Sequence, residues 1–184
     1  MRVALPGDLD ADGAAKAGSV VHGQRLSECM LDPAQDPSLD PRSLTPDQWR
    51  SLLGPLEYAI LREAATERGG TGRYLDDPGP GAFHCAGCGQ ALYGAAHKFH
   101  SGCGWPSFFQ EVVPGALREI VDHTHGMTRT EMRCSRCDGH LGHIFADAPR
   151  TPTGMRHCVN GSAILFVAAG ETVAATFARH RPAR

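Results

Sequence analysis

The chain has 184 residues, of which 41% are hydrophobic, so it can bury one sizeable core and we expect one compact domain. Its 18 basic and 20 acidic residues give a formal net charge of -2, which excludes the strong overall field that draws proteins to nucleic acid or anionic membranes. We therefore predict neither nucleic acid nor a membrane as a partner, and we expect a monomer.

The N-terminal sequence bears on location. "MRVALPGDLDADG" has a short apolar stretch that Pro6 interrupts and acidic residues follow, unlike the apolar centre of a secretory signal. No stretch approaches the roughly 18 apolar residues of a membrane helix. We therefore expect a cytoplasmic protein. Seven cysteines in such a chain favour metal or redox chemistry over a structural disulfide framework.

The first third of the chain divides into two parts. Residues 1–44 are rich in Asp, Pro, Gly and Ser, with Asp-Pro pairs recurring in "LDPAQDPSLDPRS"; this composition predicts a disordered or loosely docked extension because it buries little apolar surface. The next stretch, "LTPDQWRSLLGPLEYAILREAATERGG", predicts two short helices. Thr45 is the N-cap of the first, Pro46 is its first residue, and Gly54-Pro55 separates the two.

From Gly72 onward the pattern indicates an antiparallel β domain. Short β-prone runs are separated by Gly, Pro and Asp; they are "AFHC", "SFFQEVV", "REIVD", "TEMRC", "HIFA" and "AILFVAA". The segment "RTPTGMRH" predicts a turn that leads into a strand beginning near Cys158. We place the domain at residues 45–167 and predict no role for the C-terminal tail, residues 168–184.

Two C-x-x-C pairs, "CAGC" and "CSRC", predict a metal site. Each pair can place two thiolates on one side of a tight turn, and together they supply the four ligands of a tetrahedral structural zinc site: Cys85, Cys88, Cys134 and Cys137. The 45 residues between the pairs imply a metal that clamps two distant hairpins. The alternative is a thioredoxin-like redox pair, but such a pair opens a helix in a βαβ unit and neither pair here does.

Three cysteines remain after the four ligands. Cys29 lies in the predicted extension, and we predict no role for it. Cys103, in "SGCGWPSF", lies between two glycines, a context that favours an exposed thiol able to seek a partner. Cys158 follows Arg156 and His157, either of which could lower its pKa. The alternative for Cys158 is an ordinary buried strand cysteine.

Other polar and aromatic residues are candidates for the same site. His140 and His143 in "HLGH" follow the second cysteine pair closely, so a metal there would hold both imidazoles in place. They could instead be metal ligands or core histidines. Trp105 could be a core residue or the wall of an apolar pocket beside a mobile thiol. Asn160 could orient a polar group near Cys158.

Several of these motifs, in this order, resemble the methionine-R-sulfoxide reductases, the B type. The segments that carry the resemblance are "ILREAATERGGTGRY", "KFHSGCGWPSF", "GMTRTEMRCSRCDGHLGHIFADAPRTPTGMRHCVNGSAILF" and the two C-x-x-C pairs. They extend over roughly residues 45–167. The resemblance implies a zinc-stabilised fold of two antiparallel sheets, the β-tent or Mss4-like type, with helices at its N-terminal side.

The resemblance also implies residue roles. Cys158 corresponds to the nucleophile, Cys103 to the resolving thiol and Trp105 to the residue that contacts the substrate methyl group. The other positions that match the family's site are His140, His143, Asn160 and, beside the nucleophile, Arg156. The four paired cysteines match the zinc ligands.

The implied reaction reduces methionine-R-sulfoxide, free or in proteins, to methionine. Attack by the Cys158 thiolate, with His143 or His140 protonating the oxygen, yields a sulfenic acid that Cys103 converts to a disulfide. Thioredoxin is the implied reductant. The chain departs from the family at His157, where tyrosine is common, and in "RGGTG" after Glu67, where an aromatic is frequent.

Other functions remain open on the residues alone. A non-catalytic binding module on the same scaffold would not need both thiols and the histidine pair. A zinc-ribbon nucleic-acid binder should show a basic stripe with interleaved aromatics. A Cys-His hydrolase would leave Cys103 without a role.

Overall fold

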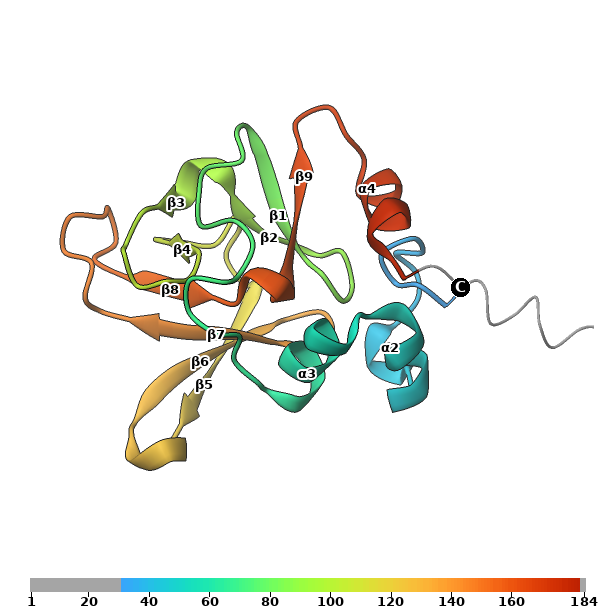
Figure 1. The fold of residues 1–184 in the computed structure, drawn as a ribbon, viewed down its shortest axis with the longest axis horizontal. Coiled ribbons are helices and arrows are strands. Elements are labelled where there is room, and N and C mark those ends of the chain that lie inside the picture. Colours follow the sequence, from blue (N-terminus) through green and yellow to red (C-terminus); the bar gives the residue numbers. More distant parts are fainter. Residues whose placement is uncertain (1–30, 183–184) are drawn as a thin grey trace, which may run out of the picture.

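The computed structural model describes residues 31–182, and Figure 1 shows their arrangement. The helices are η1 (Pro41–Ser43), α2 (Pro46–Leu52), α3 (Pro55–Glu63), η2 (Ala95–His97), η3 (Thr124–Gly126), η4 (Gly161–Ala163) and α4 (Val173–His180). The strands are β1 (Gly81–Cys85), β2 (Ala91–Gly94), β3 (Lys98–Phe99), β4 (Ser107–Phe108), β5 (Leu117–Asp122), β6 (Arg129–Cys134), β7 (His140–Phe145), β8 (Arg156–Val159) and β9 (Ile164–Ala168).

The strands form two antiparallel sheets. The larger sheet has the order β3-β4-β8-β7-β6-β5, and the smaller one has the order β2-β1-β9. In Figure 1 the two sheets lie beside each other, with α2 and α3 at one side. The predicted fold class, mainly β with two antiparallel sheets and N-terminal helices, is confirmed.

Aromatic side chains join the two sheets. Phe83 of β1 and Tyr93 of β2 come from the smaller sheet, Phe108 of β4 comes from the larger one, and all three are fully buried. The Tyr93 and Phe108 rings stack with centroids 4.2 Å apart, and Phe83 meets Phe108 edge-on at 4.9 Å. Such aromatic pairs add about 0.5–1.5 kcal/mol each beyond area burial.

The two N-terminal helices form as their capping residues predict. The Thr45 side chain accepts from the Gln48 amide and the Gln48 side chain accepts from the Thr45 amide, which completes a capping box before Pro46. Gly54 caps α3, and Ile60 and Leu61 of α3 are buried in the main core. Within residues 31–182, every helix is too short or too polar to cross a membrane.

The strands differ from the sequence prediction in extent. Only Ser107–Phe108 of the predicted 107–113 strand is extended, because the chain then turns: the Glu111 carboxylate accepts from the amides of Gly115 and Leu117. Strands β2 and β3 were not predicted, since they are short: Gly94 ends β2, and only the three residues of η2 separate it from β3.

The prediction of a loosely docked extension is wrong for residues 31–44. Each Asp-Pro pair makes a tight turn, in which the aspartate accepts from the amide two residues on. Asp32 and Ala34 are buried. Arginine side chains hold this segment by donating hydrogen bonds to its backbone carbonyls. The amino-acid composition of the segment gives no indication of such contacts. The rest of the predicted extension, residues 1–30, lies outside the described residues.

The C-terminal tail is also structured. Residues of α4 pack on β9, with Phe177 fully buried beside Leu165. Arg181 follows the helix and forms a two-pronged ion pair with Asp32, at 2.8 Å for each contact. The same guanidinium donates to the carbonyls of Ala86 and Gly87 at 2.8 Å. Both ends of the described chain are therefore fastened to the first C-x-x-C turn.

A second arginine reinforces this fastening. Arg136, in the second C-x-x-C turn, donates to the carbonyl of Cys88 at 2.6 Å and to that of Pro33 at 2.9 Å. It also donates to the carbonyls of Pro37 and Leu39. We refer to Arg136, Arg181 and Asp32 as the arginine clasp. It connects the two C-x-x-C turns, the N-terminal segment and the tail.

Removal of the Arg181 charge is expected to destabilise the fold strongly. Arg181→Met leaves the Asp32 carboxylate, 8% exposed, without its cation, and breaking a buried pair costs about 3–5 kcal/mol. Urea unfolding followed by tryptophan fluorescence measures the loss. The control is Arg179→Met: its pair with Glu171 is exposed and is worth about 1 kcal/mol or less. Equal small losses in both variants would contradict a structural role for the clasp.

Candidate active site and metal centre

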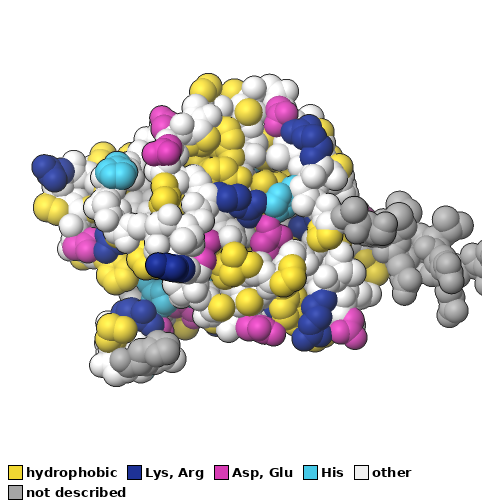
Figure 2. Space-filling view, viewed as in Figure 1, with side chains coloured by type: hydrophobic (Ala, Val, Ile, Leu, Met, Phe, Trp, Pro, Cys, Tyr) yellow, Lys and Arg dark blue, Asp and Glu magenta, His cyan; other side chains and the backbone are white. Residues whose placement is uncertain are grey.

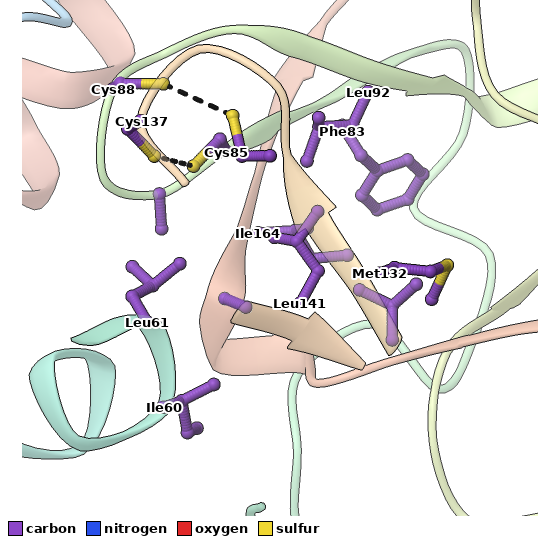
Figure 3. Close-up of a cluster of buried hydrophobic side chains, with 14 of the residues drawn as sticks. Ile60, Leu61, Phe83, Cys85, Cys88, Leu92, Met132, Cys137, Leu141 and Ile164 are labelled. Atoms are coloured by element: carbon purple, nitrogen blue, oxygen red, sulfur yellow. Dashed lines mark hydrogen bonds between the residues drawn. The ribbon is translucent and has the colours of Figure 1, made fainter. Parts of the chain in front are cut away.

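The four paired cysteines form one buried cluster. Cys85 ends β1 and Cys134 ends β6, and the turn after each strand supplies the second member of its pair. All four sulfurs lie within 4.8 Å of one another. The Cys85–Cys137 and Cys88–Cys134 sulfur pairs are each 3.6 Å apart. Figure 3 shows the cluster next to Leu61 of α3 and the main hydrophobic core.

The spacing of these sulfurs fits a four-coordinate metal ion. Zinc with four sulfurs at about 2.3 Å sets adjacent sulfurs about 3.8 Å apart in a tetrahedron. The cluster includes neither His140 nor His143, and it is the only such group of potential ligands in residues 31–182. The alternative that these histidines bind the metal is therefore not supported.

The two remaining described thiols lie together. Cys158 is on β8 and Cys103 is in the loop between β3 and β4, and their sulfurs are 3.7 Å apart. The pairing of β4 with β8, which sets Ser107 opposite Cys158, brings this loop to the thiol. Ser101 and Ser107 lie 3.0 Å and 3.5 Å from the Cys103 sulfur. Cys29 lies outside the described residues.

The environments of the two thiols shift their pKa values in opposite directions. Burial opposes ionisation of Cys103, but hydrogen bonds with Ser101 and Ser107 outweigh it and lower its pKa to about 7. Burial, followed by the adjacent Cys103, raises the pKa of Cys158 to about 12. Arg156 lowers the pKa of Cys158, as predicted, but burial raises it by more. The more acidic thiol is therefore Cys103.

His157 does not act on the Cys158 thiol as the sequence suggested. Neighbouring residues of a strand point to opposite faces. His157 is buried with its ring edge-on to Tyr93, at 5.8 Å between centroids. Burial lowers the pKa of His157. His157, which stands where the family commonly has tyrosine, therefore lies in the core behind the thiol.

Each histidine of "HLGH" is bound by a carboxylate. His143 Nε2 lies 2.9 Å from Asp122, which also accepts from Arg129 at 2.7 Å. Hydrogen bonds, first from Thr124 and then from His143, hold the Asp122 pKa well below its usual range. His140 Nδ1 lies 2.6 Å from Glu131. Burial outweighs this carboxylate and lowers the pKa of His140. Such carboxylates orient an imidazole and fix its tautomer.

A cavity of about 220 Å³ gathers most of the predicted site residues. Those that line it are Cys158, Trp105, His143 and Asn160, together with Thr66, Arg129, Gly142 and Phe145. Gly142 is required here, because a Cβ atom at this position would overlap the carbonyl oxygen of Cys158. Of the other predicted site residues, Cys103 and Arg156 face a different cavity. His140 is 97% buried and lies behind His143, with 5.6 Å between ring centroids.

Arg156 is held by groups other than the thiol. Its guanidinium makes two contacts with Asp147, at 2.9 Å and 2.7 Å, and lies 4.5 Å from the Phe145 ring centroid. The Asp147 carboxylate raises the pKa of Arg156 further above its usual range. The guanidinium is therefore a fixed positive charge near both sulfurs.

Glu67 is a site residue that sequence reasoning missed. Its buried carboxylate accepts from the amides of Gly161 and Ser162 and from the Ser162 hydroxyl. Its backbone carbonyl accepts from Trp105 Nε1 at 3.2 Å, and its amide donates to the Asn160 side chain at 3.1 Å. Glu67 thus joins two residues that line the cavity. No periodicity in the sequence indicates a role for Glu67. The only signal is its position in the "ATERGG" loop, just after the end of a helix.

Asp122, Arg129 and Glu131 were also missed. They lie on the β5–β6 hairpin, and the pairing of Glu131 with His143 across β6 and β7 places them at the histidines. A charged residue in a half-exposed strand normally indicates a solvent-facing side chain, so only the strand register reveals these contacts.

On the face of the molecule seen in Figure 2, positive and negative side chains are interspersed. This face does not show the basic stripe that is expected of a nucleic-acid binder.

Comparisons with known proteins give the same family. A family model described as the SelR domain matches residues 53–168, more than half of the chain. The peptide methionine sulfoxide reductase MsrB of Synechococcus sp. is 50% identical over 127 residues, which are 69% of this chain and 93% of that protein. That of Burkholderia thailandensis is 48% identical over 122 residues, 66% of this chain and 85% of that protein.

A third relative agrees. The peptide methionine sulfoxide reductase MsrB of Agrobacterium fabrum is 52% identical over 118 residues, 64% of this chain and 87% of that protein. The matched region contains the four-cysteine cluster, both neighbouring thiols and the residues of the cavity around Cys158. The resemblance read from the sequence motifs is confirmed, and the chain belongs to the SelR family, together with these MsrB proteins.

Proposed function

We propose that the protein is a peptide-methionine (R)-S-oxide reductase, which reduces methionine-R-sulfoxide, free or in proteins, to methionine. The observation that carries the proposal is that one cavity is lined by Cys158, Trp105, His143 and Asn160 together. The names of the MsrB relatives support the same activity. The cytoplasmic location and the monomeric state stay predictions from sequence.

The apolar wall of the cavity accounts for substrate binding. The rings of Trp105 and Phe145 line it and supply the surface that the methyl group of the sulfoxide requires. The Trp105 ring is oriented by its hydrogen bond to Glu67. The sulfoxide sulfur is a stereocentre. A pocket that has separate positions for the methyl group, the oxygen and the sulfur lone pair therefore accepts only one of the two epimers. We assign the methyl group to Trp105 and the oxygen to the side occupied by His143 and Asn160.

The first chemical step transfers the sulfoxide oxygen to Cys158. The Cys158 sulfur attacks the sulfoxide sulfur and gives its proton to the Cys103 thiolate, while His143 protonates the oxygen. The attack forms a transient bond between the two sulfurs. The hydroxyl group then moves to Cys158 as this bond and the substrate sulfur–oxygen bond break, so methionine leaves and Cys158 becomes a sulfenic acid. A sulfur with a raised pKa is intrinsically the stronger nucleophile once it has lost its proton. His143 is the donor because it lines the cavity, whereas His140 is buried behind it.

The second step closes a disulfide. Cys103 attacks the Cys158 sulfenic acid, the sulfur–sulfur bond forms, and the hydroxyl group leaves as water. The two sulfurs start 3.7 Å apart and finish about 2.05 Å apart. A shift of the Cys103 loop, which contains two glycines at positive φ, supplies this movement. Thioredoxin, a protein dithiol, then reduces the disulfide.

The four-cysteine cluster holds zinc in this proposal. Cys85, Cys88, Cys134 and Cys137 would supply all of its ligands, and bound zinc would supply structural stability. Four thiolates leave no open coordination position for a substrate. The four cysteines would therefore use the metal to fix the β6–β7 hairpin that carries the histidines, and the redox steps would be left to the thiol pair.

Substitution of each thiol tests the reaction. Cys158→Ser removes the nucleophile, so we expect no turnover of the separated R epimer with either dithiothreitol or thioredoxin. Neither this variant nor the unaltered protein should reduce the S epimer. Cys103→Ser should complete one turnover and accumulate a sulfenic acid, detected as a dimedone adduct, but fail with thioredoxin. Full activity of Cys158→Ser would refute the proposal. Efficient thioredoxin cycling without Cys103 would assign the resolving role to another thiol.

The thiol pKa values predict the order of alkylation. Because Cys103 has a pKa of about 7 and Cys158 one of about 12, iodoacetamide at pH 7 should modify Cys103 first, at a rate that rises with pH up to about 8. In Cys103→Ser the neighbouring charge is gone, so the Cys158 pKa should fall and its modification at pH 7 should accelerate. Peptide mass spectrometry measures both. Modification of Cys158 first in the unaltered protein would contradict the assignment.

Metal content tests the cluster. Native mass spectrometry should find one zinc per chain, and Cys85→Ser should lose it, with a large fall in thermal stability because the two hairpin turns are no longer joined. Cys103→Ser, which changes a thiol outside the cluster, is the matched control and should retain zinc. A metal-free protein of unchanged stability would rule out the structural zinc.

A further inference from the structure

The carboxylate of Glu67 is a buried group that the proposed reaction does not use. Glu67 is 4% exposed, and among residues 31–182 no basic group forms an ion pair with it. Its carboxylate instead accepts from the amides of Gly161 and Ser162, and from the Ser162 hydroxyl at 2.7 Å. A buried polar group is costly unless hydrogen bonds satisfy it. The three donors therefore hold this carboxylate in one place.

These donors belong to η4, the short helix that directly follows the strand of Cys158. Asn160 is the N-cap residue of η4, and its side-chain oxygen accepts from the Glu67 amide at 3.1 Å. Glu67 therefore contacts three consecutive residues, 160–162, through its backbone amide and its carboxylate. The Asn160 side of the substrate cavity is thereby fastened to Glu67.

The backbone carbonyl of the same residue holds the tryptophan wall of the cavity. Trp105 Nε1 donates to the Glu67 carbonyl at 3.2 Å. The residues that follow pack closely on Trp105, since a Cβ atom at Gly69 would lie only 3.0 Å from the indole Cη2. The Gly70 amide donates to the carbonyl of the residue before Trp105 at 2.8 Å. This loop therefore braces the indole, and Glu67 connects the indole to Asn160.

Gly72 leaves the space that the Glu67 carboxylate fills. A Cβ atom at position 72 would overlap Glu67 Oε1 and lie 2.7 Å from the carboxyl carbon. The φ angle of Gly72 lies outside the left-handed region, so space rather than backbone conformation requires glycine here. Glu67 and Gly72 are therefore a matched pair, because a side chain at position 72 would displace the carboxylate.

We propose that Glu67 is a positioning residue that fixes the Trp105 and Asn160 sides of the substrate cavity relative to each other, and so sets the selectivity for a methyl group at the sulfoxide sulfur. The inference rests on the proposed function, in which Trp105 receives the methyl group and Asn160 lies on the side of the oxygen. These two residues come from separate segments, the β3–β4 loop and the turn after β8, and Glu67 is hydrogen-bonded to both. A larger alkyl group fits only if Trp105 moves, and the bond to Glu67 opposes that movement.

Ethionine sulfoxide, which carries an ethyl group in place of the methyl group, measures this selectivity. One additional methylene group in an apolar pocket changes kcat/KM by roughly 10–200-fold. With dithiothreitol as the reductant, the unaltered protein should therefore prefer methionine-R-sulfoxide over ethionine-R-sulfoxide by a factor in this range. Equal kcat/KM values for the two substrates would overturn the inference, because there would be no selectivity for Glu67 to set.

Two substitutions release the Trp105 wall by different means. Glu67→Ala removes the carboxylate, and Gly72→Ala displaces it with a methyl group. In each variant the preference for methionine-R-sulfoxide should fall on the order of tenfold, since Trp105 can then move to admit the ethyl group. Glu67→Gln keeps the volume and one acceptor oxygen, so it should retain more of the preference than Glu67→Ala. The matched control is Gly94→Ala, which should leave the preference unchanged because the added Cβ atom would lie 3.9 Å from His97.

The preference is a ratio of two kcat/KM values, so a smaller fraction of folded protein does not change it. If Glu67→Ala and Gly72→Ala both lower the two kcat/KM values by the same factor, Glu67 only supports the fold and the inference is overturned. Absence of methionine-R-sulfoxide turnover in the unaltered protein would instead overturn the proposed function.

Discussion

The four-sulfur cluster is the constraint on which the rest of the structure depends. It joins the end of β1, in the smaller sheet, to the end of β6, in the larger one, and so connects two turns that are far apart in the sequence. His140 and His143 follow the last sulfur within one short strand. Arg136 and Arg181 donate to the backbone of the first turn, so both ends of the described chain also depend on the cluster.

The thiol pair shows how position in the fold sets reactivity. Cys103 and Cys158 are the same residue type, 3.7 Å apart, yet two serine hydroxyls lower the pKa of one and burial raises that of the other. The raised pKa favours the protonated form of Cys158 at neutral pH. The two residues line separate cavities.

Much of this arrangement could be predicted from sequence because short motifs determine local chemistry. The two C-x-x-C pairs, the capping residues Thr45 and Gly54, and the β-prone runs each indicate their structure within a few residues. The carboxylates that bind the histidines could not be predicted, because Asp122 and Glu131 reach them only through strand pairing. Residues 31–44 were misjudged because arginine side chains, rather than apolar burial, hold them.

The sequence by itself therefore determined the family, the fold class, the four cysteines of the cluster and the identity of the two redox candidates, since each follows from residue types at fixed spacing. Only the tertiary structure decided which thiol is the more acidic, which histidine lines the cavity, and that Glu67 supports Trp105 and Asn160. Desolvation and hydrogen bonding arise between residues distant in sequence. They exist only once the two sheets and the connecting loops have come together.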